Sequence, residues 1–417
     1  MDIPFIAQGL LINDTTHNKV SQSKLNSTEY GLDHQRSICF MTGLVMMLVL
    51  FLCLGSTAFA AGSMQGAFIN VGDKQAANRA FVKDVSERVL LPSFEAFSMQ
   101  SRHLSQTANT FCNAGRTTEQ FAQLKNSWRT TQQAWAQTLP FRFGPVLENF
   151  LDLKIQFWSD DKNLVRSQAQ RFLRANSSPT AEQLAKAASP AQGLPAIEYL
   201  LFDSEEGGFA TFTDGGSANQ RCDYLKAAAQ NVSNKSRDLL NAWGNSSRGY
   251  LAEFTYSSNP EVINESFAVI LREALVAVEV VKNLKVAKPS GLHLPNAKVN
   301  AFFLESWRSQ RSQENMISSL ITFQQIYYGG SHFGLDDLLI SNYNEPDVEF
   351  RLRTQISKCL ELASALPKPL FSEIKKSKTQ GQMEELHREL IKLIAMIKQS
   401  LSQTLGITIG FSSNDGD

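Results

Sequence analysis

The chain has 417 residues, enough for two domains of ordinary size that each bury a core of their own. Its 40 basic and 40 acidic residues cancel, and this balance argues against nucleic acid or an anionic membrane as the main partner. Charged residues make up only 19% of the sequence and phenylalanine is plentiful, a profile that is typical of a helical protein outside the cytosol.

An apolar segment near the N-terminus predicts export. Residues 41–62 read MTGLVMMLVLFLCLGSTAFAAG, which ends in the small-x-small pattern of a signal peptidase site, and Arg36 lies upstream. We therefore expect a signal peptide over about residues 36–60, cleaved after Ala60, and a periplasmic protein. The alternative is a signal segment that is not cleaved and that associates the protein with the membrane. The polar residues ahead of it are predicted to be a disordered extension.

Helical patterns dominate the rest of the sequence, and strand patterns are scarce. Asn259, Pro260 and Glu261 form a typical helix start, and the apolar face that follows extends over 260–286. Other amphipathic runs cover 73–110, 117–138, 146–158, 161–173, 180–188, 219–243, 298–326, 348–364 and 382–404. The sequence therefore predicts an all-α fold.

A short internal repeat predicts two related halves. Ser127-Trp128-Arg129 recurs as Ser306-Trp307-Arg308, each in a run predicted as helix and followed by a loop with glycine and aromatic residues. We interpret this as two similar four-helix bundles that arose by duplication, joined near 244–258. The expected division is 1–60 for the extension and signal peptide, 61–250 for the first bundle and 251–410 for the second.

The cysteines indicate one disulfide bond. Cys39 and Cys53 fall in the segment expected to be removed, which leaves Cys112, Cys222 and Cys359. In an oxidising compartment, a bond between Cys112 and Cys222 would tie two distant helices of the same half. Cys359 lies in a helical pattern and is expected to be a buried free thiol.

One acidic residue stands out in an apolar stretch. Residues 193–202 read GLPAIEYLLF, in which Glu198 follows a helix start at Pro195. A buried carboxylate must be paired, protonated or bound to a metal. The alternative is an exposed glutamate in the first helical turn, where the helix dipole favours an acid.

The segment FFLESWRSQRSQENM, residues 302–316, offers partners for such a carboxylate. On a helix Arg308 and Arg311 would adjoin on one face, with Glu305 and Ser312 beside Arg308. Two adjacent guanidinium groups favour an anion between them, and Trp307 provides a flat wall nearby. A solvated helix face is the other interpretation.

Sequence templates for catalysis are missing. None of the 6 histidines has the paired spacing of a zinc site, and no nucleophile elbow, P-loop or dinucleotide fingerprint occurs. From the residues alone, the argument for an enzyme is therefore poor.

Five motifs together resemble the imelysin-like family, in particular its branch of predicted periplasmic lipoproteins. In chain order they are FRFGP, QFWSD, GLPAIEYLLF, RCDYL and ESWRSQRSQENM, and the resemblance covers about residues 73–405. It implies two similar four-helix bundles with a functional site at their interface, and a role linked to bacterial iron acquisition.

The resemblance also bears on metal binding. The family's Gly-x-His-x-x-Glu motif maps onto residues 193–198, and Pro195 occupies the histidine position. A prolyl ring cannot ligate a metal, so Glu198 remains as the one candidate metal ligand of the motif, and iron or another divalent metal stays an open cofactor.

The resemblance raises the hypothesis that Glu198 meets Arg308 or Arg311 across the interface, within about 8 Å or through a bridging water. The expected ligand-binding residues are Glu198, Tyr199, Ser306, Trp307, Arg308, Arg311, Ser312, Trp128, Phe143 and Gly144.

The leading hypothesis is an exported, non-catalytic protein that binds a small ligand, or partner proteins, in iron or haem uptake. The alternatives are a metallopeptidase-type hydrolase and a helical interaction module without a small ligand.

Overall fold

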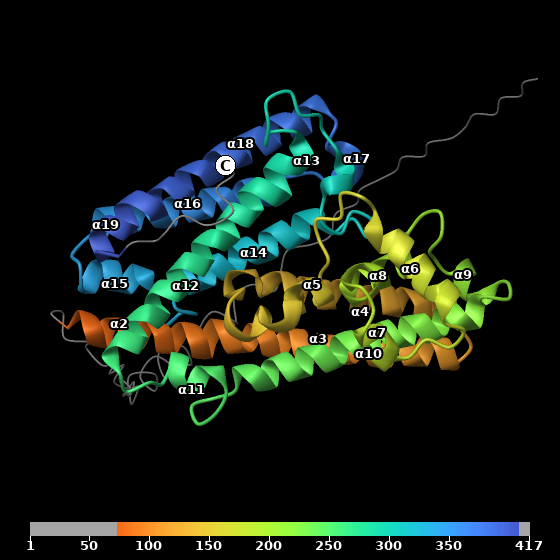
Figure 1. The fold of residues 1–417 in the computed structure, drawn as a ribbon. Coiled ribbons are helices and arrows are strands. Elements are labelled where there is room, and N and C mark those ends of the chain that lie inside the picture. Colours follow the sequence, from red (N-terminus) through yellow and green to blue (C-terminus); the bar gives the residue numbers. More distant parts are fainter. Residues whose placement is uncertain (1–72, 408–417) are drawn as a thin grey trace, which may run out of the picture. The chain divides into compact units, whose positions relative to one another are not determined.

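The structure, a computed structural model, describes residues 73–407, which are helical and contain no β-strand (Figure 1). This confirms the prediction of an all-α fold. The predicted signal peptide, Cys39 and Cys53 lie outside the described residues. Among the helices that are described, none is long and apolar enough to cross a membrane.

The α-helices are, in chain order, α2 (Lys74–Val85), α3 (Leu91–Asn113), α4 (Thr118–Gln137), α5 (Leu151–Ile155), α6 (Leu164–Ala175), α7 (Ala181–Ala185), α8 (Gly193–Phe202), α9 (Ala210–Thr213), α10 (Ala218–Trp243), α11 (Tyr250–Phe254), α12 (Pro260–Val280), α13 (Lys288–Ser290), α14 (Ser312–Tyr327), α15 (Leu335–Ser341), α16 (Pro346–Ser364), α17 (Leu370–Glu373), α18 (Ser377–Ala395) and α19 (Ser402–Leu405).

Several of these helices continue through π-helical turns into longer rods. The turn η1 (Ser86–Leu90) joins α2 to α3, and η6 (Val281–Ala287) joins α12 to α13. The helix α12 begins where the sequence predicts, because the Asn259 side chain accepts a hydrogen bond of 3.0 Å from the Glu261 amide and Pro260 fills the first turn.

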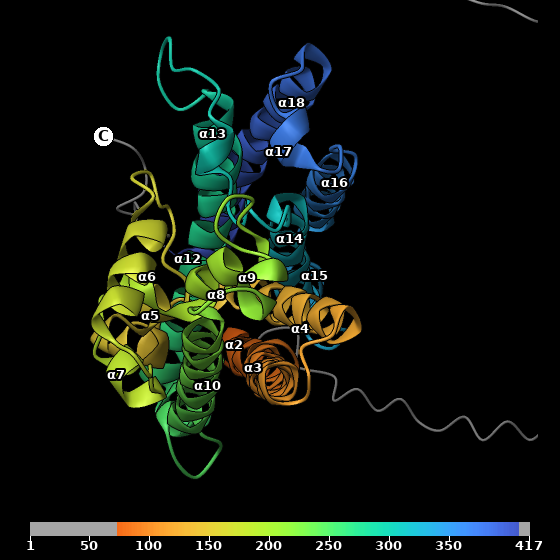
Figure 2. The same cartoon turned by 90° about the vertical axis from the view of Figure 1, so that its right-hand side faces the viewer.

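Two sets of long helices form the interior. Helix α3 packs on both α4 and α10, whereas α14 and α18 both pack on α16 (Figure 1). The two sets also touch, since α2 packs on α12 and α14 lies against α4 (Figure 2). The division into two duplicated bundles near residue 250 remains our proposal.

The predicted helix over 298–326 is wrong in its first half. Residues Ala301–Phe303 form a single 3-10 turn, and the chain then passes through turns until α14 begins at Ser312. Ser306 and Gln310 have left-handed backbone conformations, with φ of 51° and 62°, which an α-helix does not accommodate. The second copy of the Ser-Trp-Arg repeat therefore lies in turns, whereas the first lies in α4.

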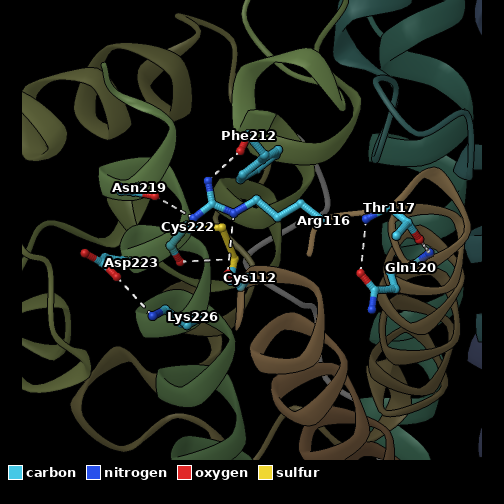
Figure 3. The surroundings of a disulfide bond; sticks show 9 residues. All are labelled: Cys112, Arg116, Thr117, Gln120, Phe212, Asn219, Cys222, Asp223 and Lys226. Carbon is cyan, nitrogen blue, oxygen red and sulfur yellow. Dashed lines mark hydrogen bonds and ion pairs between the residues drawn. A yellow bond between two sulfur atoms is a disulfide. The ribbon is translucent and has the colours of Figure 1, made fainter. Parts of the chain in front are cut away.

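A disulfide bond ties α3 to α10. Cys112 and Cys222 are bonded with 5.6 Å between their Cα atoms (Figure 3). Arg116, one turn beyond Cys112, donates a hydrogen bond of 2.8 Å to the carbonyl of Phe212, so this end of the two helices is closed by several contacts. Cys359 is a buried free thiol on α16.

Removal of the disulfide should destabilise the fold strongly. Cys112 and Cys222 are 110 residues apart, and closing a loop of that length restricts the unfolded chain by about 3–5 kcal/mol. We expect the double variant Cys112→Ser/Cys222→Ser to lose that free energy of unfolding in urea titrations. A reductant should destabilise the wild type equally and leave the double variant unchanged; an unaltered wild-type midpoint would contradict the prediction.

Candidate functional site: a buried polar junction

The helix that carries Glu198 is buried over almost its whole length. Residues 193–201 are all buried, and Gly193 has a φ of +77°. A Cβ atom at Gly193 would lie 2.3 Å from the carbonyl oxygen of Ile155, so only glycine allows α5 to approach this closely. On another side, the Trp128 indole of α4 donates a hydrogen bond of 3.0 Å to the carbonyl of Leu194. The start of α8 is therefore fixed from two directions.

Glu198 is bound by Ser309. Its Oε1 atom accepts one hydrogen bond of 2.8 Å from the Ser309 amide and another of 2.7 Å from the Ser309 hydroxyl. The residue is 4% exposed, so the alternative of a solvent-facing glutamate is wrong. Among the described residues neither Arg308 nor Arg311 forms an ion pair with Glu198: the turns of 304–311 bring the Ser309 amide to the carboxylate, and Arg308 acts on Glu198 through its charge.

Arg308 pairs with the residue that ends α8. Its Nε donates to Asp203 Oδ2 at 2.9 Å, and its Nη2 donates to Asn163 Oδ1 at 2.7 Å. The guanidinium also lies 4.2 Å from the centroid of the Trp307 ring. Arg308 and Asp203 are both almost fully buried, which makes this a desolvated ion pair.

A second buried ion pair continues the polar contacts into α14. Lys285 of η6 donates to Glu305 Oε2 at 2.8 Å and to the Ser319 hydroxyl at 3.3 Å. Ser319 in turn donates to the carbonyl of Ala136 in α4 at 3.2 Å. We call the set Glu198, Asp203, Lys285, Glu305, Arg308 and Ser309 the buried polar junction.

Arg142 differs from the other cations beside the junction. It belongs to the FRFGP motif, and its guanidinium lies 4.2 Å from the centroid of the Trp135 ring. Its Nε is buried without a hydrogen-bond partner, and within residues 73–407 the arginine has neither a hydrogen bond nor an ion pair. Burial lowers the pKa of Arg142 to about 10, although the charges of Asp152 and Glu305 act in the opposite direction.

Burial dominates the electrostatics of Glu198. It raises the pKa of the carboxyl above its ordinary value, because a charge is poorly solvated in the interior. The charge of Arg308 and the two hydrogen bonds from Ser309 lower the pKa, while Glu305 raises it further. The net direction is upward.

Other residues predicted for the site lie around the junction. The Tyr199 hydroxyl donates to the carboxylate of Glu206, and the Tyr199 ring centroid is 5.9 Å from the guanidinium of Arg308. Ser306 accepts a hydrogen bond of 3.1 Å from Asn315. Ser312 donates to the carbonyl of Glu305 at 2.6 Å.

Arg311 is directed to other partners, and Trp307 contacts Phe371 as well as Arg308. Arg311 pairs with Glu314 at 3.5 Å and donates a long hydrogen bond of 3.4 Å to Gln133. The ring of Trp307 stacks on Phe371, with centroids 5.3 Å apart. Arg308 and Arg311 therefore do not form the shared face that a helix would give them.

The aromatic residues proposed for the site pack into the core. Trp128 is fully buried and its ring lies 5.2 Å from that of Phe202. Phe143 packs against Trp243 at 5.4 Å and Phe254 at 5.2 Å. Gly144 adjoins the ring of Tyr250, where a Cβ atom would come within 2.9 Å. The structure does not bring Phe143 and Gly144 to Glu198.

Sequence reasoning missed Ser309, Asp203, Lys285 and Arg142. Ser309 and Arg142 lie inside the motifs ESWRSQRSQENM and FRFGP, and Asp203 directly follows GLPAIEYLLF, so their positions in or beside the motifs are the signal that marks them. Lys285 sits in an apolar helical run and carries no comparable signal.

Metal-ligating residues do not cluster at the junction. In the part of the chain that is described, no group of three or more histidine, cysteine, aspartate or glutamate side chains could hold a metal ion. Glu198, the proposed ligand, has Pro195 one turn before it. The arrangement that is present, three carboxylates and two cations in contact with serine hydroxyls, is suited to fixing two segments together and to recognising polar groups.

The family model for imelysin, Peptidase_M75, matches residues 90–397. The chain therefore belongs to the imelysin family.

Two solved structures share the fold. An imelysin-like protein from Psychrobacter arcticum 273-4 is 23% identical with a TM-score of 0.67, and the alignment covers 82% of this chain and 100% of that one. A candidate iron-regulated protein A precursor from Parabacteroides distasonis ATCC 8503 is 18% identical with a TM-score of 0.62, over 78% of this chain and 95% of that one. No curated protein matches the sequence.

The raised pKa of Glu198 predicts a pH dependence of stability. A carboxyl whose pKa is higher in the folded state than its ordinary 4.5 stabilises the fold below that value and loses this contribution as pH rises through the folded pKa. We expect the difference in unfolding free energy, wild type minus Glu198→Gln, to fall as pH increases from about 4 to 8. Urea titrations across this range measure it, and a difference that grows with pH would show that the pKa is lowered instead.

Proposed function

We propose that this protein is an exported, non-catalytic binding protein that takes an anionic ligand beside its buried polar junction, in iron or haem uptake. Membership of the imelysin family and the likeness to an iron-regulated protein A precursor support the link to iron. The apolar N-terminal run with its small-x-small ending supports export.

The anionic class of the ligand is inferred from Arg142. Buried or half-buried guanidinium groups in proteins are normally paired with carboxylates or hydrogen-bond acceptors. Arg308 and Lys285 follow this rule, through Asp203 and Glu305. Arg142 has only the face of Trp135, which leaves its donors available for an anion.

Two unpaired indole donors, one beside Arg142 and one beside Lys285, support the same class of ligand. The indole Nε1 atoms of Trp135 and Trp158 are buried without partners, and Trp158 lies 5.9 Å from the Lys285 ammonium. Indole and guanidinium donors suit carboxylate or phosphate oxygens.

The residues of the motif helix do not favour a peptidase. Zinc peptidases hold their metal with histidine and carboxylate ligands, whereas here Pro195 stands at the motif histidine and the oxygen of Glu198 that accepts hydrogen bonds is bound by Ser309. We assign Glu198 a positioning role: it holds the 304–311 segment against α8.

Citrate, free and as its ferric complex, is a suitable probe of this proposal, because it presents carboxylates and its iron complex is anionic. We expect calorimetry to detect binding to the wild-type chain and Arg142→Gln to weaken it by at least about tenfold, since a charged hydrogen-bonded contact is lost. Arg171→Gln, an exposed arginine on α6, is the matched control and should bind as the wild type does.

The proposal fails if Arg142→Gln binds citrate and ferric citrate as tightly as the wild type, or if the wild type binds neither. Far-ultraviolet circular dichroism of each variant separates loss of binding from loss of fold. If ferric citrate binds and free citrate does not, the iron complex itself is the ligand.

A further inference from the structure

A pocket lies outside the buried polar junction. It has a volume of about 480 Å³ and is lined by α7, α10 and the segment 145–154. None of the junction residues lines it. A volume of this size lies within the range of roughly 300–1,000 Å³ that small-molecule sites occupy.

The charges of this pocket are separated by depth. Lys154 and Lys235 line it as half-buried residues, whereas its acidic residues Glu148, Glu182 and Asp238 are exposed. The pocket therefore has cations inside and carboxylates at its edge.

The two lysines lack carboxylate partners. The Lys235 ammonium donates to Gln192 Oε1 at 2.8 Å and to the side-chain oxygen of Asn231, which are neutral acceptors. Within the described range, Lys154 and Lys235 form no ion pair. Asp238, the nearest acid on α10, is bound by Arg237 at 3.0 Å.

The rest of the wall is largely apolar. Pro145, Leu151, Leu239 and Ala242 line the pocket together with the two lysines. Pro145 and Leu239 are buried, so apolar surface reaches the inner part of the pocket. A ligand would thus meet cations, an apolar wall and carboxylates in one site.

We propose that this pocket binds a zwitterionic molecule of the amino-acid class with an apolar side chain. Its carboxylate lies between Lys154 and Lys235, its ammonium group faces the acids at the edge, and its side chain packs on Leu151 and Leu239. A free amino acid and a short peptide share this chemistry.

The electrostatics of Lys235 agree with this assignment. Burial lowers the pKa of Lys235 to about 8, the charge of Lys154 lowers it further, and Asp238 acts in the opposite direction. A carboxylate between the two ammonium groups would relieve both the burial and the repulsion. Because Lys235 donates to Gln192, which directly precedes Gly193, the lysine connects this pocket to the turn from which α8 starts.

Calorimetric titration of the whole chain tests this with three related probes. We expect L-leucine to bind at least about tenfold more tightly than 4-methylpentanoate, which lacks the ammonium group, or 3-methylbutylamine, which lacks the carboxylate. Lys154→Gln should weaken L-leucine binding by a similar factor and leave the fold intact, because within residues 73–407 the Lys154 ammonium forms no hydrogen bond or ion pair. Lys186→Gln, an exposed neighbour outside the pocket, should have no effect.

The inference is overturned if L-leucine does not bind, if the two truncated probes bind as well as L-leucine, or if Lys154→Gln binds it as the wild type does. Leucyl-leucine is titrated in parallel. If it binds more tightly than L-leucine the ligand is a short peptide, and if it binds more weakly the ligand is a free amino acid. Because Arg142 is not part of this pocket, the citrate experiment can fail while this one succeeds, and the reverse.

Discussion

The structure depends on the contact between Glu198 and Ser309. A carboxylate that is 4% exposed is costly unless its oxygens accept hydrogen bonds, and Ser309 supplies two, from its amide and from its hydroxyl. This contact joins α8 to the turns before α14. The ion pair of Arg308 with Asp203 joins the same two segments at the end of α8. Breaking a buried ion pair by removing one partner typically costs about 3–5 kcal/mol, so the Arg308–Asp203 pair reinforces the hydrogen bonds from Ser309 in holding the two segments together.

In this arrangement some polar groups fix the fold, whereas others remain available to bind a ligand. Lys285 and Arg308 are satisfied by Glu305 and Asp203, and they hold neighbouring elements together. Arg142 is held by Trp135 alone and keeps its donors free. A rigid surrounding is what lets an unpaired guanidinium keep its position, because its neighbours cannot relax to pair with it. In our account, recognition therefore rests on Arg142, and Glu198 acts by positioning.

The sequence predicted the helices well where local signals act, and the site less well. The start of α12 follows from Asn259 and Pro260, whose capping chemistry is local. The break in the predicted helix before α14 could not be predicted from the sequence, because Ser306 and Gln310 are not residue types that usually adopt a left-handed backbone. That error changed the site: on a helix Arg311 would lie beside Arg308, whereas in turns Ser309 reaches Glu198. Pairings such as Lys285 with Glu305 depend on tertiary packing, which no local pattern encodes.

A double-mutant cycle between Glu198 and Ser309 tests the central claim most directly. The free energies of unfolding of Glu198→Ala, Ser309→Ala and the double variant give the coupling between the two side chains, and Glu198→Ala with Arg311→Ala provides the matched comparison. The account predicts a coupling of at least about 1 kcal/mol with Ser309 and additivity with Arg311 within about 0.5 kcal/mol. Additivity with Ser309, or strong coupling with Arg311, would contradict it.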